Sequence, residues 1–432
     1  MTAMLSIIKT RQRLSWLQQT SWPPLLVCLC LASVHLLAKL ASVRGSGGLW
    51  PSDKFTAEPT GRQMMNPSKP QPKASIRSLL SYRPSFGKAK QGRLIRLSAN
   101  EGALGASPRV YEALQAEALS PFRYPEVQDQ QLNEAIAERY GLEPSRILSS
   151  NGSDELISLI TMAYLEPGDE VVMSQYAFLV IPQATRIAGG TVVQADDVDM
   201  VTNVDNLLAA VTPKTKILFL VNPNNPTGTM IEMDEVRRLH ANLPPHILLV
   251  LDWAYAEYLD QSFSDEAARM VETYDNVVMT RTFSKLHGLA GLRLGWAYCS
   301  PDLLTTLASI RGPFSVNQAA FRAGIAAVQD RDFQEKSVAH NAKWIAAMVP
   351  FLDQLGLQVI PSSTNFILFR FDETTGPSAQ QASEFFASEN ILLRTMEPYG
   401  LGDCLRMSIG TDEEMAVVKD AFIRLMQPSS AT

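Results

Sequence analysis

The sequence predicts an α/β fold in which a mostly parallel sheet is flanked by helices. Three short apolar runs, at 217–221, 247–251 and 277–280, are too short and too continuous for amphipathic helices. Such runs are typical of strands buried on both faces. A helical pattern occurs at 132–140, where apolar side chains repeat every four residues. Strand and helix patterns that alternate along the chain indicate a parallel sheet.

Two helix starts are also predicted. Ser107 followed by Pro108 suits an N-cap and the first residue of a helix. Residues 151–154 (NGSD) open the apolar helical stretch 155–165. The exposed N–H groups and the dipole at such a helix start favour a bound phosphate.

Polar residues follow each predicted strand. The first strand is followed by 222–228 (NPNNPTG), the second by Asp252 and Tyr255, and the third by 282–285 (TFSK), with Arg293 eight residues beyond the lysine. The carboxyl ends of parallel strands meet at one edge of a sheet, where ligands collect. A lysine, a carboxylate and a phosphate-binding helix start together indicate an aldehyde cofactor that carries a phosphate.

Size and charge narrow the possible partners. The chain has 432 residues, 46% of them hydrophobic, which predicts two domains. It carries 38 basic and 44 acidic residues, a net charge of −6, which argues against a nucleic-acid partner and favours a small molecule. Its 4 cysteines form neither a disulfide framework nor a metal-ligand pattern, so no metal is expected and a reducing, cytoplasmic compartment fits.

The first 52 residues carry basic side chains and no acidic ones, and 23–38 is almost wholly apolar. Two interpretations stay open. Residues 1–63 are an extension that is disordered or precedes the true start, since Met64 and Met65 open a polar, Pro-rich stretch. Alternatively, the apolar run is a signal or anchor for membrane contact or export, although it is shorter than the roughly 20 residues that span a bilayer.

Seven segments together resemble a known family. They are 97–108 (LSANEGALGASP), 123–128 (RYPEVQ), 151–157 (NGSDELI), 222–228 (NPNNPTG), 252–258 (DWAYAEY), 282–296 (TFSKLHGLAGLRLGW) and 404–411 (CLRMSIGT). In this order and spacing they resemble the fold-type I pyridoxal-phosphate aminotransferases, most closely the histidinol-phosphate aminotransferase family. The resemblance implies an N-terminal arm at 64–98, a large cofactor-binding domain at 99–315 and a small α+β domain at 316–432 that is completed by the arm.

The resemblance assigns four residues to the cofactor ring, pyridoxal 5′-phosphate. Lys285 would bond to the cofactor aldehyde and carry the proton between substrate and cofactor. Asp252 would pair with the pyridine nitrogen and keep it protonated. Asn225 and Tyr255 would hydrogen-bond the 3′-oxygen. Taken alone, each of these residue types also occurs at ordinary surface, cap or turn positions.

It further assigns a phosphate site and a stacking residue. Arginine suits two phosphate oxygens at once, and hydroxyl and backbone N–H groups would complete the set. The implied phosphate ligands are the backbone of Gly152, Ser153 and Asp154, the hydroxyls of Thr282 and Ser284, and Arg293. Tyr176 would stack on the cofactor ring, although a core tyrosine is the alternative.

Substrate and subunit contacts are implied in the same way. Tyr124 would reach the cofactor phosphate of a neighbouring subunit in a homodimer, the alternative being local packing. Arg406 would bind the carboxylate of the amino donor, and Arg394 would meet anionic groups or be merely solvated. Asn100 opens the loop over the substrate, where the family's usual Asn-Glu-Asn-Pro-Leu-Gly reads Asn-Glu-Gly-Ala-Leu-Gly. His287 replaces a frequent aromatic residue.

The expected reaction is L-histidinol phosphate plus 2-oxoglutarate giving imidazole acetol phosphate plus L-glutamate, a step of histidine biosynthesis. Three alternatives stay open. An aromatic or broad-specificity aminotransferase would share every cofactor residue, and a decarboxylase of the same family would release carbon dioxide without an oxo-acid acceptor. Transcription regulators with an aminotransferase-like domain carry a winged-helix module, for which the leader is too short.

Overall fold

The computed structural model describes residues 70–77, 79, 93–116, 122–125, 129–374 and 376–427. All the elements below belong to one compact unit, Gln71–Thr432. The predicted extension, 1–63, lies outside the described residues. No helix in the described part of the chain combines the length and apolarity needed to cross a membrane.

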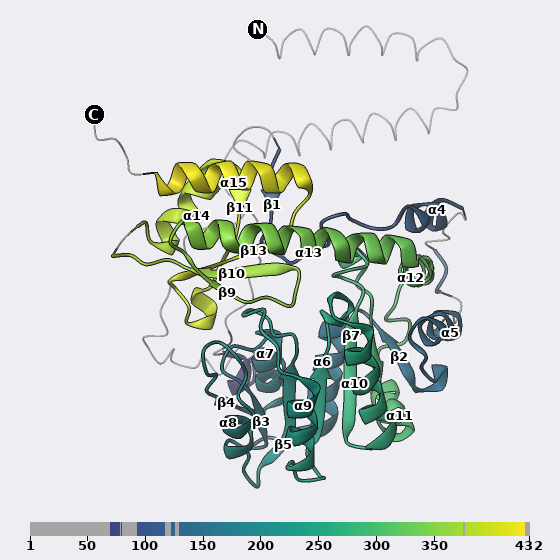
Figure 1. Cartoon of the computed structure of the whole chain (residues 1–432). Helices are drawn as coiled ribbons and strands as arrows, with labels where there is room; N and C mark the ends of the chain where they lie inside the picture. Colours follow the sequence, from purple (N-terminus) through teal and green to yellow (C-terminus); the bar gives the residue numbers. More distant parts are fainter. Residues whose placement is uncertain are drawn as a thin grey trace, which may run out of the picture. The chain divides into compact units, whose positions relative to one another are not determined.

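The larger sheet has seven strands and forms the lower half of the molecule in Figure 1. The three predicted strands are adjacent and parallel in it, which confirms the predicted fold class. Only β8 runs antiparallel to its neighbours β7 and β2. In spatial order the strands are β2 (Ile147–Ser150), β8 (Gly295–Tyr298), β7 (Val277–Thr282), β6 (Leu248–Asp252), β5 (Thr215–Val221), β3 (Glu170–Ser174) and β4 (Thr191–Ala195).

Helices cover both faces of this sheet because side chains alternate along each strand. On β5, Ile217 and Phe219 pack against one helical layer, and Leu218 and Leu220 against the other. The first layer contains α6 (Ser153–Tyr164), α7 (Val180–Ala188) and α11 (Pro301–Ile310). The second contains α4 (Pro108–Ala116), α5 (Asp129–Tyr140), α8 (Val204–Ala209), α9 (Met233–Ala241), α10 (Gln261–Thr273) and α12 (Gln318–Gln329).

The predicted helix starts are confirmed. The α4 helix begins at Pro108, and the Ser107 hydroxyl accepts a hydrogen bond from the Arg109 N–H at 3.1 Å. The same hydroxyl donates to Asp330, the N-cap of α13. One serine therefore ties two helices that are distant in sequence. Short 3-10 turns complete this half of the unit: η3 (Pro144–Arg146), η4 (Ala256–Tyr258) and η5 (Ala290–Leu292).

The smaller sheet is antiparallel and carries its helices on one face (Figure 1). Its strands, in spatial order, are β12 (Arg394–Thr395), β13 (Cys404–Ser408), β10 (Phe366–Arg370) and β9 (Gln358–Ile360). The covering helices are α13 (Arg331–Gln354), α14 (Ala379–Ser388) and α15 (Asp412–Met426). Beside them, β1 (Ile95–Arg96) pairs in parallel with β11 (Ile391–Leu392), and the remaining short elements are α3 (Ala74–Arg77) and η6 (Glu397–Tyr399).

The face of the smaller sheet that the helices do not cover carries two buried arginines, Arg394 and Arg406. On β13, Leu405 and Met407 pack under the helices, so Arg406 lies on the opposite face. The domain boundaries at 98/99 and 315/316 stay predictions. Around the second boundary, Val316 and α12 pack into the core of the larger sheet.

Candidate active site

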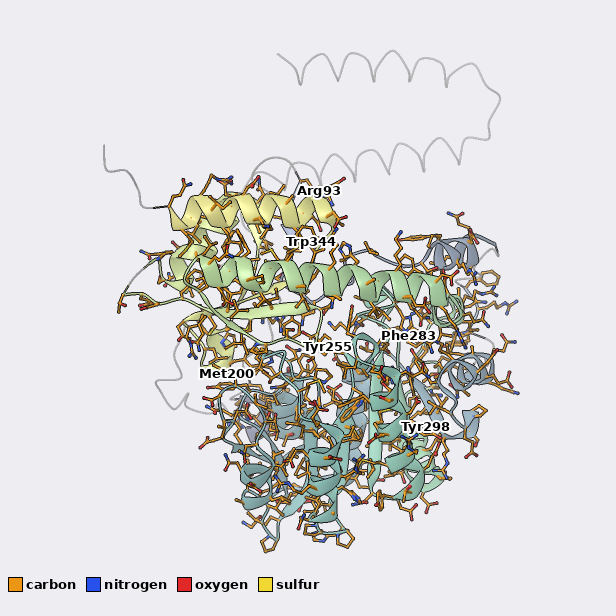
Figure 2. All side chains as sticks on the ribbon, viewed as in Figure 1. Arg93, Met200, Tyr255, Phe283, Tyr298 and Trp344 are labelled. Atoms are coloured by element: carbon orange, nitrogen blue, oxygen red, sulfur yellow. The ribbon has the colours of Figure 1, made fainter. Side chains whose placement is uncertain are left out.

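The carboxyl ends of three adjacent strands bring the predicted residues together. Asp252 ends β6, Thr282 ends β7 and Asn222 follows β5. Tyr255 follows β6 and lies between the larger and the smaller sheet (Figure 2). The arrangement is the one that the order of parallel strands dictates, because successive strands end at the same edge.

Lys285 lies at the centre of this group. Its Nζ donates a hydrogen bond to the Ala99 carbonyl oxygen at 3.3 Å and stands 5.8 Å from the centroid of the Tyr255 ring. The pKa of this amine is lowered to about 8, chiefly by removal from water. The charges of Arg406 and Arg293 also lower it, and those of Asp154 and Glu101 oppose them. A neutral, nucleophilic amine is therefore accessible near neutral pH.

Asp252 is buried on the face of the sheet that packs against α6. Burial raises the pKa of its carboxyl to about 7, and the negative charge of Asp154 adds to this rise. The Thr280 hydroxyl donates to Asp252 Oδ1 at 3.5 Å, and Lys285 is the basic side chain whose charge lowers this pKa. The charged carboxylate is thus disfavoured relative to the neutral acid in the folded protein. A positive group beside it would therefore be bound strongly.

The loop that begins at Asn100 is fastened to Tyr255. Asn100 Nδ2 donates to the Tyr255 hydroxyl at 2.8 Å, and both side chains are buried. Gly102 packs so closely that a Cβ there would lie 2.7 Å from the Lys285 carbonyl oxygen. This close contact gives a steric reason for glycine at a position where the family usually has asparagine.

Arg406 reaches from the smaller sheet to the larger one. Its Nη1 donates to Asn225 Oδ1, and its Nη2 donates to the Ser98 carbonyl oxygen at 3.3 Å. Arg394 is directly opposite Arg406 on β12, and both side chains are buried. Two guanidinium groups on neighbouring strands favour an anionic ligand.

Three of the residues predicted to bind phosphate, Gly152, Asp154 and Arg293, lie together at the start of α6. A Cβ at Gly152 would lie 2.7 Å from the Arg293 guanidinium, and the positive φ of 81° also requires glycine. Arg293 Nη2 donates to Asp154 Oδ2 at 3.2 Å, and the Ser284 N–H donates to Thr282 Oγ1 at 3.1 Å. A helix start and an arginine meet here, which suits an anion with several acceptor oxygens.

Two aromatic residues are placed differently from this group. Tyr124 is 78% exposed and stacks on Phe314, with ring centroids 4.6 Å apart. Tyr176 is half-buried and packs against an apolar cluster that includes Ile360 and Leu368 of the smaller sheet. The contact of Tyr124 with a second subunit and the stacking of Tyr176 on a ligand both stay predictions.

Sequence reasoning missed two residues that hold the Asn100 loop. Asn365 Nδ2 donates to the carbonyl oxygens of Asn100 and Glu101 at 3.1 and 3.2 Å, and the Asn100 N–H donates to Ser408 Oγ at 2.8 Å. The signal for Asn365 was a polar side chain directly before the apolar strand β10. Ser408 was inside a recognised segment, 404–411, but its contact with the loop could not be read from spacing.

His287 is buried rather than exposed to a ligand. Its ring packs against Phe283, with centroids 4.8 Å apart. Burial lowers its pKa from 6.5 to about 4, and the charges of Arg281 and Arg139 lower it as well, while Glu257 opposes them. The folded protein therefore holds this histidine neutral.

Acid should destabilise the fold through His287. In the unfolded chain this histidine takes up a proton below pH 6.5, whereas in the folded chain it does so only near pH 4. Between pH 7 and pH 5 this amounts to about 2 kcal/mol of the free energy of unfolding. In urea titrations, His287→Phe should lose that much less stability than the wild type over this interval. The exposed His246, replaced by Gln, should leave the wild-type dependence intact, and an equal loss in His287→Phe would contradict the assignment.

Comparisons with known proteins agree on one family. The model described as Aminotransferase class I and II matches residues 93–422. The histidinol-phosphate aminotransferase of Rhodospirillum centenum is 49% identical over 330 residues, 76% of this chain and 91% of that protein. That of Paramagnetospirillum magneticum is 48% identical over 348 residues, 80% of this chain and 96% of that protein.

A solved structure gives the same result. The crystal structure of histidinol-phosphate aminotransferase from Sinorhizobium meliloti in complex with pyridoxal-5′-phosphate has a TM-score of 0.75 and 27% identity to this chain, and the match covers 85% of this chain and 99% of that one. The family model spans the residues of both sheets, from β1 into α15. The chain therefore belongs to the histidinol-phosphate aminotransferase family of the class I and II aminotransferases.

Proposed function

We propose that this protein is a pyridoxal-phosphate-dependent aminotransferase that converts L-histidinol phosphate and 2-oxoglutarate to imidazole acetol phosphate and L-glutamate, in histidine biosynthesis. The observation that carries the proposal is Lys285. Its amine has a lowered pKa, and the charges of Asp154 and Arg293 at the proposed phosphate site and of Arg406 on the smaller sheet shift that pKa. Relatives 48 and 49% identical carry the name of this activity.

The residues present fit the cofactor. The Gly152 backbone packs so closely on the Arg293 guanidinium that no Cβ fits between them, so the first N–H groups of α6 and the guanidinium could bind the same phosphate. Asp252, with its raised pKa, would hold the pyridine nitrogen protonated, because a positive ring favours the carboxylate. When bound, pyridoxal phosphate supplies an aldehyde that reacts with amines and a ring that accepts electrons.

Each remaining residue has a part in binding or proton transfer. Asn225 and Tyr255 would bind the 3′-oxygen, Thr282, Ser284 and the amides of 152–154 the phosphate, and Tyr176 the ring face. Lys285 Nζ would hold the aldehyde end and then move the proton from the substrate Cα. Two half-reactions with the amino group held on the cofactor predict ping-pong kinetics.

Substrate binding would fall to the smaller sheet and the Asn100 loop. Arg406 would exchange its bond with Asn225 for the carboxylate of glutamate, since a guanidinium pairs with a carboxylate through two hydrogen bonds. Arg394, on the neighbouring strand, would meet the second anionic group. Asn100, held by Tyr255 and Ser408, would position the loop that covers the substrate.

We also propose a homodimer and a cytoplasmic location. The exposed Tyr124 and Phe314 form an aromatic pair that a second subunit could cover, which would let Tyr124 reach the neighbouring phosphate site. Cys299 and Cys404 are buried free thiols, and free thiols fit a reducing compartment.

The rate of cofactor capture should rise with pH. The amine of Lys285 must be neutral to attack the aldehyde, and its pKa is about 8. We expect the rate of appearance of the visible cofactor absorbance in cofactor-free protein to increase about tenfold per pH unit below pH 8 and to level off above it. A plateau that begins only near pH 10 would show an ordinary exposed lysine.

The substrate is tested by half-reactions. The cofactor-loaded protein is mixed separately with histidinol phosphate, glutamate, phenylalanine and tyrosine, and loss of the visible absorbance is followed. Rapid loss with histidinol phosphate and glutamate supports the proposal. Faster loss with the aromatic donors would keep the cofactor site and replace the proposed substrate, and carbon dioxide release without 2-oxoglutarate would indicate a decarboxylase.

A further inference from the structure

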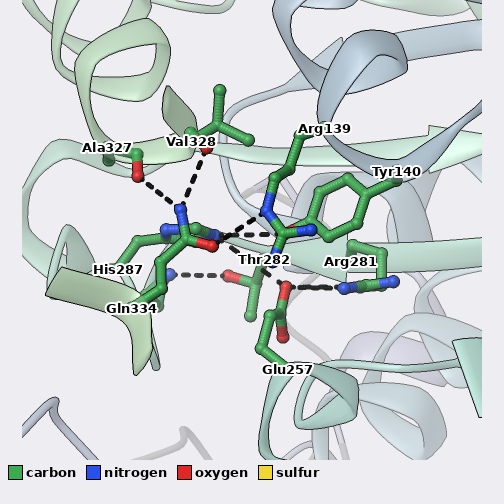
Figure 3. A network of polar contacts seen from close by, with 10 residues as sticks. Arg139, Tyr140, Glu257, Arg281, Thr282, His287, Ala327, Val328 and Gln334 are labelled. Atoms are coloured by element: carbon green, nitrogen blue, oxygen red, sulfur yellow. Dashed lines mark hydrogen bonds and ion pairs between the residues drawn. The ribbon is translucent and has the colours of Figure 1, made fainter. Parts of the chain in front are cut away.

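A buried ion pair joins Arg281 of β7 to Glu257 of η4, next to segments that carry the proposed site (Figure 3). Arg281 Nη2 and Glu257 Oε1 are 2.9 Å apart, and the two side chains are only 2% and 4% exposed. The guanidinium carbon of Arg281 is 4.8 Å from the centroid of the Tyr140 ring and 5.4 Å from that of Trp296. His287 Nε2 is 4.0 Å from the same carboxylate oxygen. The pair is thus enclosed by aromatic rings and by a histidine that stays neutral.

Further polar side chains on α5 and α13 hold this group to the helical layer. Tyr140 Oη is 3.5 Å from His287 Nε2. Arg139 Nε donates to Gln334 Oε1 at 3.1 Å, and Gln334 donates in turn to the carbonyl oxygens of Ala327 and Val328 at 2.8 and 3.0 Å (Figure 3). The network therefore anchors the ends of α5, α12 and α13 beneath the site.

The charged members are close in sequence to the site residues but face the other way. Side chains alternate along β7, so Thr282 lies on the face of the layer that contains α6, while Arg281 faces α5. Glu257 is in η4, two residues after Tyr255. Lys285 follows Arg281 by four residues. The ion pair consequently joins the segment that carries Tyr255 to the segment that carries Lys285.

Stability does not explain why charges occupy this place. Removing two charges from water costs about as much as their attraction returns, and apolar residues of similar volume are often as stable. Glu257 Oε2 also finds no hydrogen-bond donor among the described residues, and an incompletely paired buried carboxylate is unfavourable. A role in geometry is the better explanation.

We propose that the Arg281–Glu257 pair is a positioning element that sets the distance between Lys285 and Tyr255, and so the fit of the cofactor. The inference rests on the proposed function, because it concerns the same site. Arg281 and Glu257 act through the backbone of β7 and η4, and neither touches the reacting atoms. A guanidinium held between two rings allows little movement, which suits a fixed distance.

The test is a double-mutant cycle with Glu257→Leu, Arg281→Met and the combination. The double variant has no unpaired charge and leaves the net charge unchanged, so any change in the site reflects geometry. Its cofactor-free form should melt within a few degrees of the wild type. Its dissociation constant for pyridoxal phosphate should rise about tenfold or more and kcat should fall up to about 100-fold, the scale of a 1 Å misplacement. The pH midpoint of the visible absorbance should shift as well.

Wild-type affinity and an unchanged pH midpoint in the double variant would overturn the proposal and leave the pair a structural element. If the double variant fails to fold, Glu257→Gln is measured instead, with weaker cofactor binding expected and wild-type binding overturning the proposal. Glu143→Gln with Arg146→Gln, an ion pair at η3, is the matched control and should bind the cofactor normally. A wild-type protein that binds no cofactor would refute the proposed function instead.

Discussion

Replacing Lys285 by alanine is expected to abolish transamination and the visible absorbance of the bound cofactor while the fold is retained. The amine is the group that bonds to the aldehyde and moves the substrate proton, and general acid–base catalysis alone contributes about 100- to 10,000-fold. We therefore expect kcat to fall at least about 1,000-fold. Among the described residues the side chain donates one hydrogen bond, at 3.3 Å to the Ala99 carbonyl oxygen, so little stability depends on it.

The measurement combines steady-state rates with an absorbance spectrum and a melting curve. Lys336→Ala, which removes an exposed lysine of α13, should match the wild type in all three. The Lys285→Ala protein should still bind pyridoxal phosphate reversibly, because the proposed phosphate site at Arg293 and the start of α6 is unchanged. A variant that transaminates at more than a few per cent of the wild-type rate would refute the assignment of Lys285.

Asp252→Asn is expected to lower kcat by about 100-fold to several thousandfold, the equivalent of the 3–5 kcal/mol lost when one partner of a buried ion pair is removed. An amide cannot keep the pyridine nitrogen protonated, so the ring accepts electrons poorly. The phosphate contacts persist, and cofactor binding should weaken less than turnover. Asp420→Asn, an exposed change on α15, is the control.

The same variant makes a prediction for the cofactor-free protein. The folded pKa of Asp252 is raised from 3.8 to about 7, so the stability it contributes is present below pH 3.8 and lost as the pH rises through 7. The loss corresponds to about 4 kcal/mol. Without cofactor, Asp252→Asn should therefore be more stable than the wild type at pH 8. Equal stability in urea titrations would show that the carboxylate is not under-stabilised.

Local composition was enough to predict the strands and the helix starts of the larger sheet. The strands β5, β6 and β7 are apolar on both faces because helices cover both sides of the sheet. Each strand therefore appears in the sequence as a short continuous apolar run. The polar residues that follow them meet at one edge because adjacent parallel strands end together. Family resemblance then assigned roles to residues such as Lys285 and Asp252.

Contacts between distant segments could not be predicted in the same way. Asn100 bonds to Tyr255 across 155 residues, and Arg406 bonds to Asn225 across 181. In neither pair does the sequence around one residue indicate the other. Both contacts depend on how the smaller sheet and the Asn100 loop pack on the larger sheet. Arg281 offered a faint signal, as a charge inside an apolar strand, but its partner Glu257 did not.

The sequence by itself determined the kind of fold, and it predicted the chemistry of the site and the residues for it. These depend on side-chain type and on spacing within short segments, which tertiary packing does not alter. Only the tertiary structure decided the antiparallel placement of β8, the neutral state of His287 and the charge pair behind Lys285. Each of those depends on burial and on neighbours far along the chain, and a pKa or an ion pair exists only when both are in place.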